Sequence, residues 1–292
     1  MRGRKRRVLE EGLLRECVSL PFRVDKMEKS RAYLHPYFPG REYHTSHDSK
    51  KKGLFGGTRP DFTLRFLRLV LRNRKRVKKG IYDTALWAAS SLEVLRLIER
   101  CGGRFHITGL EHILEAEPPV VYISNHMSTL ETMVFPCIIA PVMDVTFVVK
   151  ESLVSHPLFG PIMRSRDPVV VGRKDPRADF TVVIEQGRRL LEGGRSVVIF
   201  PQSTRTTRFV PAEFNSLGIK LARAAGVKVV PVAIRTDFWS SGKLIRDLGP
   251  LYPERPIHMS FGEAFSVEKS GREAHQKVVE YIRHHLEEWY SQ

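Results

Sequence analysis

The sequence has no apolar run long enough to cross a membrane. A spanning helix needs about 18 or more consecutive apolar residues, whereas the nearest approach, residues 132–143, is shorter and lies between Glu131 and Asp144. The opening residues 1–7 are mostly basic and lack the apolar core of a secretory signal. We therefore expect neither a spanning helix nor a secretory signal in this chain.

Cysteine is also scarce. Cys17, Cys101 and Cys137 are odd in number and lie far apart. A disulfide framework or a zinc knuckle needs paired or closely spaced cysteines, so neither is expected. The low number is typical of a protein in a reducing, cytosolic setting. No internal repeat is visible in the sequence.

Metal ligands are few in any one stretch. His44, His47 and Asp48 lie close together, but no further ligand cluster follows them. A structural zinc site needs four ligands. We therefore expect a solvated loop at these positions.

Acidic residues are scarce in the first quarter of the chain. Residues 1–80 contain 23 Lys and Arg against 8 Asp and Glu, which accounts for +15 of the net charge of +16 over 292 residues. Such segregated charge indicates a polyanionic partner, either an anionic membrane surface or nucleic acid. Interleaved stacking aromatics and a recognised nucleic-acid motif are both missing. We therefore expect the partner to be an anionic membrane surface and not nucleic acid. Binding to nucleic acid is kept as a remote alternative.

The charge and apolar patterns divide the chain into three segments. Residues 1–60 mix charge, Pro and Gly without periodicity and predict a basic, loosely structured region. Residues 61–103 predict two amphipathic helices, one from 61 to 76 with arginines at steps of three or four, and one from 83 to 100 that ends at a glycine pair. We expect these helices to associate with a membrane. The alternative is that they only pack against the main domain.

The third segment, residues 104–292, alternates apolar strand-like runs with helical ones. Such alternation predicts an α/β domain whose largely parallel sheet is flanked by helices and preceded by the N-terminal amphipathic helical pair. The predicted strands are residues 104–108, 119–123, 145–149, 168–172, 196–200, 228–234 and 257–261, and the predicted helices are residues 129–139, 178–192, 215–225 and 272–290.

His126 stands at a predicted strand-to-helix corner, where α/β folds place their chemistry. It follows the apolar run 120–123 and precedes Glu131 by five residues, a spacing expected about once by chance in this composition. A five-residue step turns about 140° around a regular helix. The two side chains therefore meet only if His126 lies in the turn before the helix and Glu131 in an early helical turn. A carboxylate-held imidazole can take a proton from an attacking hydroxyl.

A second turn, residues 201–205, follows the apolar strand 197–200 and exposes backbone N–H groups, hydroxyls and the guanidinium of Arg205. Such a turn suits a phosphate group. The alternative is a polar surface turn with a solvated arginine. Arg173 ends the strand 169–172 in the same way, although an arginine at a strand end is more often structural than a ligand contact.

The order of these pieces is more specific than any one of them. Over about residues 104–265 the chain resembles the glycerolipid acyltransferase superfamily, especially its 1-acylglycerol-3-phosphate (lysophosphatidate) type. That family shows Asn-His-x4-Asp, a Lys-x-x-Leu and Pro-x-x-Gly stretch leading to an arginine, Phe-Pro-Glu-Gly-Thr-Arg, and an apolar Val-Pro-Val strand. The matching residues here are Asn125, His126 and Glu131, then Lys150, Leu153, Pro157, Gly160 and Arg173, then residues 200–205, then residues 230–234.

The resemblance implies a role for each matching residue. His126 would be the general base, with Glu131 as its orienting carboxylate. Arg173 and Arg205 would bind the substrate phosphate with help from Thr204. Gln202, Ser203 and Lys150 are further candidates for substrate contact.

The implied activity is transfer of a fatty acyl group to the free hydroxyl of a lysophospholipid in phospholipid biosynthesis. The acyl donor would be acyl-CoA or acyl-carrier protein, and the acceptor 1-acylglycerol-3-phosphate. Such a reaction would need neither a metal nor a cofactor. The enzyme would be a peripheral protein on the cytoplasmic face of a membrane. Glu131 stands where the family has Asp, which keeps the carboxylate. Gln202 and Ser203 replace a Glu and a Gly, so two alternatives stay open: another lyso-lipid acceptor, or an inactive lipid-binding relative.

Overall fold

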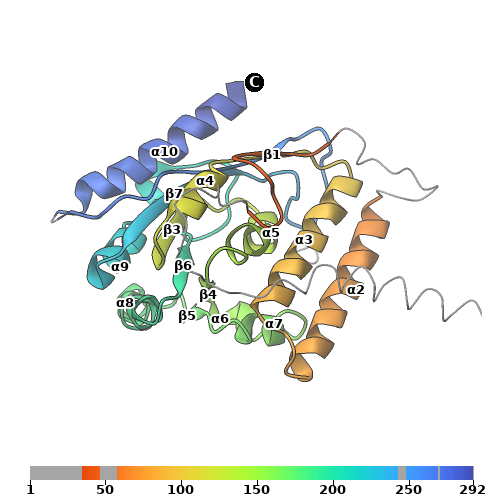
Figure 1. Ribbon diagram of the computed structural model, residues 1–292, viewed down its shortest axis with the longest axis horizontal. Coiled ribbons are helices and arrows are strands. Elements are labelled where there is room, and N and C mark those ends of the chain that lie inside the picture. The colour runs from red at the N-terminus through yellow and green to blue at the C-terminus, as the bar shows by residue number, and fades with distance from the viewer. Residues whose placement is uncertain (1–34, 47–57, 243–247, 269, 292) are drawn as a thin grey trace, which may run out of the picture. The chain divides into compact units, whose positions relative to one another are not determined.

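The computed structural model describes residues 35–46, 58–242, 248–268 and 270–291, and within these residues the core is an eight-stranded sheet (Figure 1). The strands lie in the order β1-β2-β8-β7-β3-β6-β4-β5. Their bounds are β1 Tyr43–His44, β2 Phe105–Thr108, β3 Val120–Ser124, β4 Val145–Lys150, β5 Val169–Val171, β6 Ser196–Ile199, β7 Lys228–Arg235 and β8 Ile257–Phe261.

Most neighbouring strands run parallel. Antiparallel pairing occurs where β1 meets β2 and where β7 meets β8, and the remaining pairs are parallel. The carboxyl ends of β3, β4, β5, β6 and β7 therefore lie along one edge of the sheet. Each of the predicted site segments follows one of these ends, so the topology gathers them although they are far apart in sequence.

Helices cover both faces of the sheet (Figure 1). Alternate residues of a buried strand point to opposite faces, and β3 divides its side chains accordingly. Val120 and Tyr122 join the core under α2, α3 and α5, whereas Val121 and Ile123 join the core under α8, α9 and α10. The helix bounds are α2 Arg59–Lys78, α3 Thr84–Arg100, α4 Leu110–Glu115, α5 Leu130–Ile139, α6 Glu151–Val154, α7 Gly160–Arg164, α8 Pro176–Glu192, α9 Leu217–Ala225 and α10 Arg272–Ser291, with a 3-10 turn at Pro211–Glu213.

The α/β class, the largely parallel sheet and the preceding helical pair are confirmed, and each predicted element lies within two residues of its observed bounds. Strand β1, helices α4, α6 and α7 and the 3-10 turn are additions, each of six residues or fewer. Elements this short do not establish a helical or strand period, so the sequence pattern could not predict them.

Several predictions fall wholly or partly outside the described residues. The loose structure predicted for residues 1–60 concerns mainly residues 1–34 and 47–57, which are outside the described residues. His47 and Asp48 of the suggested metal cluster are among them. Within the described residues, three or more His, Cys, Asp or Glu side chains do not gather at any point as a metal-binding group. The division of the chain at residues 60 and 103 stays a prediction.

Helices α2 and α3 lie side by side, and α5 lies between α3 and the sheet (Figure 1). The buried face of α2 includes Phe62, Phe66, Leu69 and Val70, which belong to the same core cluster as the sheet residues. Any surface that this helix offers to a membrane is therefore its opposite face. Over the parts of the chain that the structure describes, each helix is too short or too polar to span a bilayer.

Candidate active site

The end of strand β3 is tied to the end of β7 by one side chain. Asn125 is buried, its Nδ2 donates to the carbonyl of Ile234 at 2.9 Å, and its Oδ1 accepts from the N–H of Ile234 at 2.9 Å. An amide can satisfy both backbone groups because it carries a donor and an acceptor. Asn125 thus fixes the point at which the chain leaves the sheet and enters the turn that carries His126.

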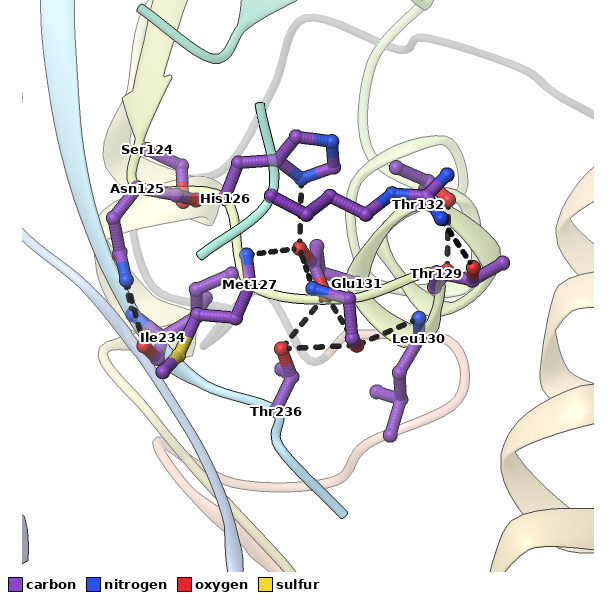
Figure 2. Close-up of polar contacts among 12 residues, drawn as sticks. Ser124, Asn125, His126, Met127, Thr129, Leu130, Glu131, Thr132, Ile234 and Thr236 are labelled. Carbon is purple, nitrogen blue, oxygen red and sulfur yellow. Dashed lines mark hydrogen bonds and ion pairs between the residues drawn. The ribbon is translucent and has the colours of Figure 1, made fainter. Parts of the chain in front are cut away.

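His126 and Glu131 form a hydrogen-bonded pair in that turn (Figure 2). His126 Nδ1 lies 2.8 Å from Glu131 Oε1, and Glu131 is fully buried in the first turn of α5. The positive end of the helix macrodipole favours an ionised carboxylate there. The His lies before the helix and the Glu in its first turn, which is the arrangement that their spacing requires.

The Glu131 carboxylate accepts four further hydrogen bonds. They come from Met127 N at 2.8 Å, Ser128 N at 2.9 Å, Ser128 Oγ at 2.9 Å and Thr236 Oγ1 at 2.7 Å (Figure 2). Burial by itself raises the pKa of this carboxyl, but the hydrogen bonds and the charge of His126 outweigh burial and lower the pKa of Glu131 overall. The carboxylate therefore stays ionised and holds the proton of His126 on Nδ1, which leaves Nε2 as the hydrogen-bond acceptor.

The loop after β6 holds the backbone and the ring of His126. Phe200 stacks on the imidazole with the ring centroids 4.4 Å apart. Gln202 is only 5% exposed, and its Oε1 accepts from the N–H of His126 at 2.6 Å. The N–H of Thr206 donates to the carbonyl of His126 at 3.0 Å. The second sequence motif thus fixes the position of the first.

A cavity of about 690 Å³ adjoins this pair of motifs. Its polar lining includes His126, Lys150, Arg173, Thr204 and Arg205, and most of its other wall is apolar. The structure therefore brings five of the eight predicted site residues to one cavity. Of the other three, Glu131 lies behind His126, and Gln202 and Ser203 are not among the lining residues.

The two arginines are held by neighbouring loops. Arg205 Nη1 donates to Thr129 Oγ1 at 2.8 Å, just before α5 begins. A guanidinium nitrogen of Arg173 donates to the carbonyl of Ser203. Burial lowers the pKa of the Arg173 guanidinium, an effect that Asp179 partly offsets, and the group stays charged because an arginine is protonated in proteins. Both cations thus reach the cavity from different strand ends.

Arg173 has an unusual backbone conformation. Its φ of 58° lies in the left-handed region, which is uncommon for residues other than glycine. Asp179 in α8 stabilises this conformation, because its carboxylate accepts from the N–H of Gly172 at 2.9 Å and from the N–H of Arg173 at 2.8 Å. Asp179 therefore sets the direction in which the arginine leaves the strand.

Sequence reasoning missed Thr236, Phe200 as a stacking partner, and Asp179. Phe200 is the last residue of the predicted strand 196–200, and Thr236 lies two residues beyond the predicted strand 228–234. A search for polar or aromatic residues at the carboxyl ends of the predicted strands would have singled out these two. Asp179 lies within α8, and its contact with Arg173 has no comparable signal in the sequence.

The fold and this site fit an α/β acyltransferase: a buried carboxylate holds an imidazole that lines a cavity, and the same cavity is lined by Lys150, Arg173, Arg205 and many apolar side chains. Residues 104–235 match the family model described as Acyltransferase. Through this segment the chain is similar to the Acyltransferase family.

Individual relatives agree with this assignment. Over 207 aligned residues the chain is 28% identical to the 1-acyl-sn-glycerol-3-phosphate acyltransferase of Pseudomonas aeruginosa. This alignment covers 70% of this chain and 74% of the relative. Over 91 residues it is 35% identical to the lyso-ornithine lipid O-acyltransferase of Rhizobium meliloti, covering 31% of this chain and 30% of the relative.

A solved structure also resembles the chain. The crystal structure of the 1-acyl-sn-glycerophosphate (LPA) acyltransferase PlsC from Thermotoga maritima matches 79% of this chain and 98% of its own, with a TM-score of 0.51 and 20% identity. At that identity the likeness concerns the fold alone. The acyltransferase class rests on the family match and on the relatives in sequence, while the acceptor and the acyl donor are matters for proposal.

Proposed function

We propose that the protein transfers a fatty acyl group from acyl-CoA or acyl-carrier protein to the free hydroxyl of a lysophospholipid, with 1-acylglycerol-3-phosphate as the acceptor. The observation that carries the proposal is the His126–Glu131 pair at a cavity that also holds Arg173 and Arg205. The similarity to 1-acyl-sn-glycerol-3-phosphate acyltransferases supports the choice of acceptor.

In this mechanism His126 acts as the general base. Nε2 takes the proton of the acceptor hydroxyl while the hydroxyl oxygen attacks the thioester carbonyl, and the ionised Glu131 stabilises the imidazolium that forms. The thiolate then leaves and takes the proton from the imidazolium, so an ester and a free thiol result. General-base catalysis of this kind contributes about 10²- to 10⁴-fold to a rate.

Arg173, Arg205 and Thr204 would bind the phosphate of the acceptor. Guanidinium groups pair with phosphate oxygens through two parallel hydrogen bonds, and Lys150 adds a further cation to the same cavity. Fixing the phosphate would hold the free hydroxyl of the acceptor close to His126 Nε2. Such positioning converts a bimolecular encounter into an oriented one.

The apolar wall of the cavity suits a fatty acyl chain. It includes Phe66, Leu69 and Val70 from α2 and Trp87 and Val94 from α3. Burying methylene groups against such a wall is favourable in proportion to the apolar area removed from water. The helical pair would thus build the acyl subsite as well as cover the sheet.

The outer face of α2 supports a peripheral position on the cytoplasmic face of a membrane. Leu64, Arg68, Leu71, Lys75 and Lys78 are all exposed. At 100° per residue they lie within an arc of about 80°, opposite the buried face of the helix. Exposed leucines beside cations are typical of helices that lie in an anionic lipid surface.

One assay tests the proposal. Purified protein is offered lysophosphatidate, its dephosphorylated counterpart and lyso-lipids with other head groups, each with acyl-CoA and with acyl-carrier protein as donor. We expect transfer to lysophosphatidate, little transfer without the phosphate, and a fall of about 10²- to 10⁴-fold in His126→Ala. Full activity of His126→Ala would contradict the mechanism, and transfer to a different lyso-lipid alone would replace the acceptor. No transfer at all would favour the inactive relative.

A further inference from the structure

A buried threonine just beyond the end of β7 contacts the carboxylate that holds His126. Thr236 is fully buried, and its Oγ1 donates to Glu131 Oε2 at 2.7 Å (Figure 2). The two residues are 105 positions apart in the sequence. Thr236 is not among the residues that line the cavity, so any effect of this residue on a bound substrate passes through its neighbours.

The two carboxylate oxygens of Glu131 have different partners. Oε1 accepts from His126 Nδ1 at 2.8 Å and from the N–H groups of Met127 and Ser128 at 2.8 and 2.9 Å. Oε2 accepts from Ser128 Oγ at 2.9 Å and from Thr236 Oγ1 at 2.7 Å. The first three partners belong to the turn that enters α5, whereas Thr236 lies outside that turn. The threonine therefore ties the carboxylate to the end of β7.

Ser128 cannot take the place of Thr236 as a second donor, because a serine hydroxyl carries one hydrogen. Ser128 Oγ lies 2.9 Å from Glu131 Oε2 and 3.2 Å from Thr236 Oγ1, and it donates to one of them at a time. Without the threonine hydroxyl, Oε2 would keep at most the donor of Ser128. Glu131 is fully buried, and a buried charge is destabilised when it loses a donor that water cannot replace.

The length of the Glu131 side chain makes an anchor outside the turn more important. The similar acyltransferase family has an aspartate at this position, and a glutamate has one more rotatable bond. Fixing that bond costs side-chain entropy, which a further contact must offset if the carboxylate is to stay aimed at His126. The end of β7 holds the turn at two points, since the backbone of Ile234 pairs with Asn125 and Thr236 binds the carboxylate.

We propose that Thr236 is a positioning residue for acyl transfer: its hydroxyl keeps the Glu131 carboxylate charged and aimed at His126, so that Nε2 stays free to accept a proton. The inference rests on the proposed function and adds a residue that acts through the His126–Glu131 pair. Burial raises the pKa of the Glu131 carboxyl, while its contacts with His126, Ser128 and Thr236 lower it. Removing the threonine hydroxyl should therefore let the pair take up a proton at higher pH.

The charged groups around the pair stay the same when Thr236 is changed. In the cavity and before α5 they are Lys150, Arg173 and Arg205, and beside Thr236 they are Arg235, Asp237 and Arg255, which form ion pairs with N–O distances of 3.6 Å. A difference in pH dependence between the wild type and a Thr236 variant thus reports the lost hydroxyl.

The test compares Thr236→Val, which removes the hydroxyl at nearly constant size, with Thr236→Ser, which keeps it. In the acceptor assay Thr236→Val should lower kcat about tenfold, the equivalent of one hydrogen bond to a charged group, and leave the KM for the acceptor unchanged. The acid limb of its pH–rate profile should move to higher pH, whereas Thr236→Ser should resemble the wild type in each respect. An NMR titration of the His126 imidazole should show the same shift without any substrate.

Thr146→Val is a matched control. Thr146 is also fully buried and donates at 2.7 Å, but to the carbonyl of Arg166. Its variant should lose stability and keep the wild-type kcat and pH profile. If Thr236→Val does not fold, Thr236→Cys, whose thiol is only a weak donor, should show the same changes to a smaller extent.

The inference would be overturned by a Thr236→Val protein with the kcat and pH profile of the wild type, or by equal losses in Thr236→Val and Thr236→Ser. The same shift of the acid limb in Thr146→Val would also overturn it. Absence of transfer by the wild type to every acceptor would instead contradict the proposed function, and the NMR titration would then decide whether Thr236 controls the His126–Glu131 pair.

Discussion

The side-chain oxygen of Gln202 accepts a hydrogen bond from the backbone N–H of His126 at 2.6 Å, across 76 positions of sequence. This bond explains how the chain tolerates Gln where the similar acyltransferase family has Glu. The position needs a buried acceptor for a backbone N–H, and an amide oxygen provides one without a charge. We therefore propose that Gln202 acts on the reaction through the position of His126 and need not touch the substrate.

Replacing Gln202 with Leu should lower kcat by about tenfold, the equivalent of roughly 1.4 kcal/mol, because the turn that carries His126 loses an anchor. The KM for the acceptor should change little. Gln202→Glu supplies an acceptor of the same shape and should retain most of the activity. Steady-state kinetics of the two variants checks this, and equal loss in both would show that the amide has another role.

Asp179 should affect the acceptor through Arg173. Its carboxylate accepts two backbone N–H groups that hold Arg173 in the left-handed region. Without it, the arginine is free to relax away from the cavity. Asp179→Ala is expected to raise the KM for lysophosphatidate about tenfold, the loss of roughly one charge-assisted hydrogen bond, with a smaller effect on kcat.

Asp175 gives a matched control for this prediction. It caps the same helix by accepting from the N–H groups of Arg177 at 2.8 Å and Ala178 at 3.3 Å. Asp175→Ala should lower the melting temperature, since the loss of a helix cap costs about 1 kcal/mol, but should leave the KM unchanged. A KM increase of the same size in both variants would indicate general damage to α8 in place of a specific role for Asp179.

His258 should make the protein less stable in mild acid. Burial, followed by the charges of His106, Arg235 and His44, lowers the pKa of His258 from 6.5 to about 4. Between pH 6.5 and about 4 the unfolded chain therefore binds a proton that the folded chain does not. The free energy of unfolding should fall through this range as the pH falls.

His258→Phe tests this pH dependence. The imidazole stacks between His106 and Trp289, with centroid distances of 4.9 and 5.0 Å, and a phenyl ring can keep both contacts without titrating. Urea unfolding of wild type and variant at pH 7, 5.5 and 4.5 should show a shallower decline for the variant. Parallel declines would mean that other groups cause the acid sensitivity.

The outer face of α2 should determine binding to lipid vesicles. Leu64→Ser with Leu71→Ser removes its apolar contacts, and Arg68→Gln with Lys75→Gln removes two cations, each worth about 1 kcal/mol near an anionic surface. Sedimentation with anionic and neutral vesicles should show weaker binding for both pairs, with salt sensitivity reduced only in the second. Arg188→Gln changes an exposed cation of α8 and should bind normally. Unchanged binding in both pairs would place the membrane contact elsewhere.

Much of the fold could be predicted from local patterns. The strands and long helices were predicted because buried parallel strands are continuous apolar runs and helices repeat every three to four residues. The His126–Glu131 geometry was also predictable, because five residues across a strand-to-helix turn leave few ways for the two side chains to meet. That the arginines share a cavity with His126 was only an expectation from resemblance.

The sequence by itself determined the α/β class, the alternation of elements and the charge of the N-terminal quarter. The tertiary structure alone decided which residues support the imidazole and what the cavity offers to a ligand. Gln202 and Thr236 reach the turn of His126 and Glu131 from other strand ends, and Phe66 faces the cavity because α2 packs with that side inward. Such contacts depend on the packing of distant segments, which no local period encodes.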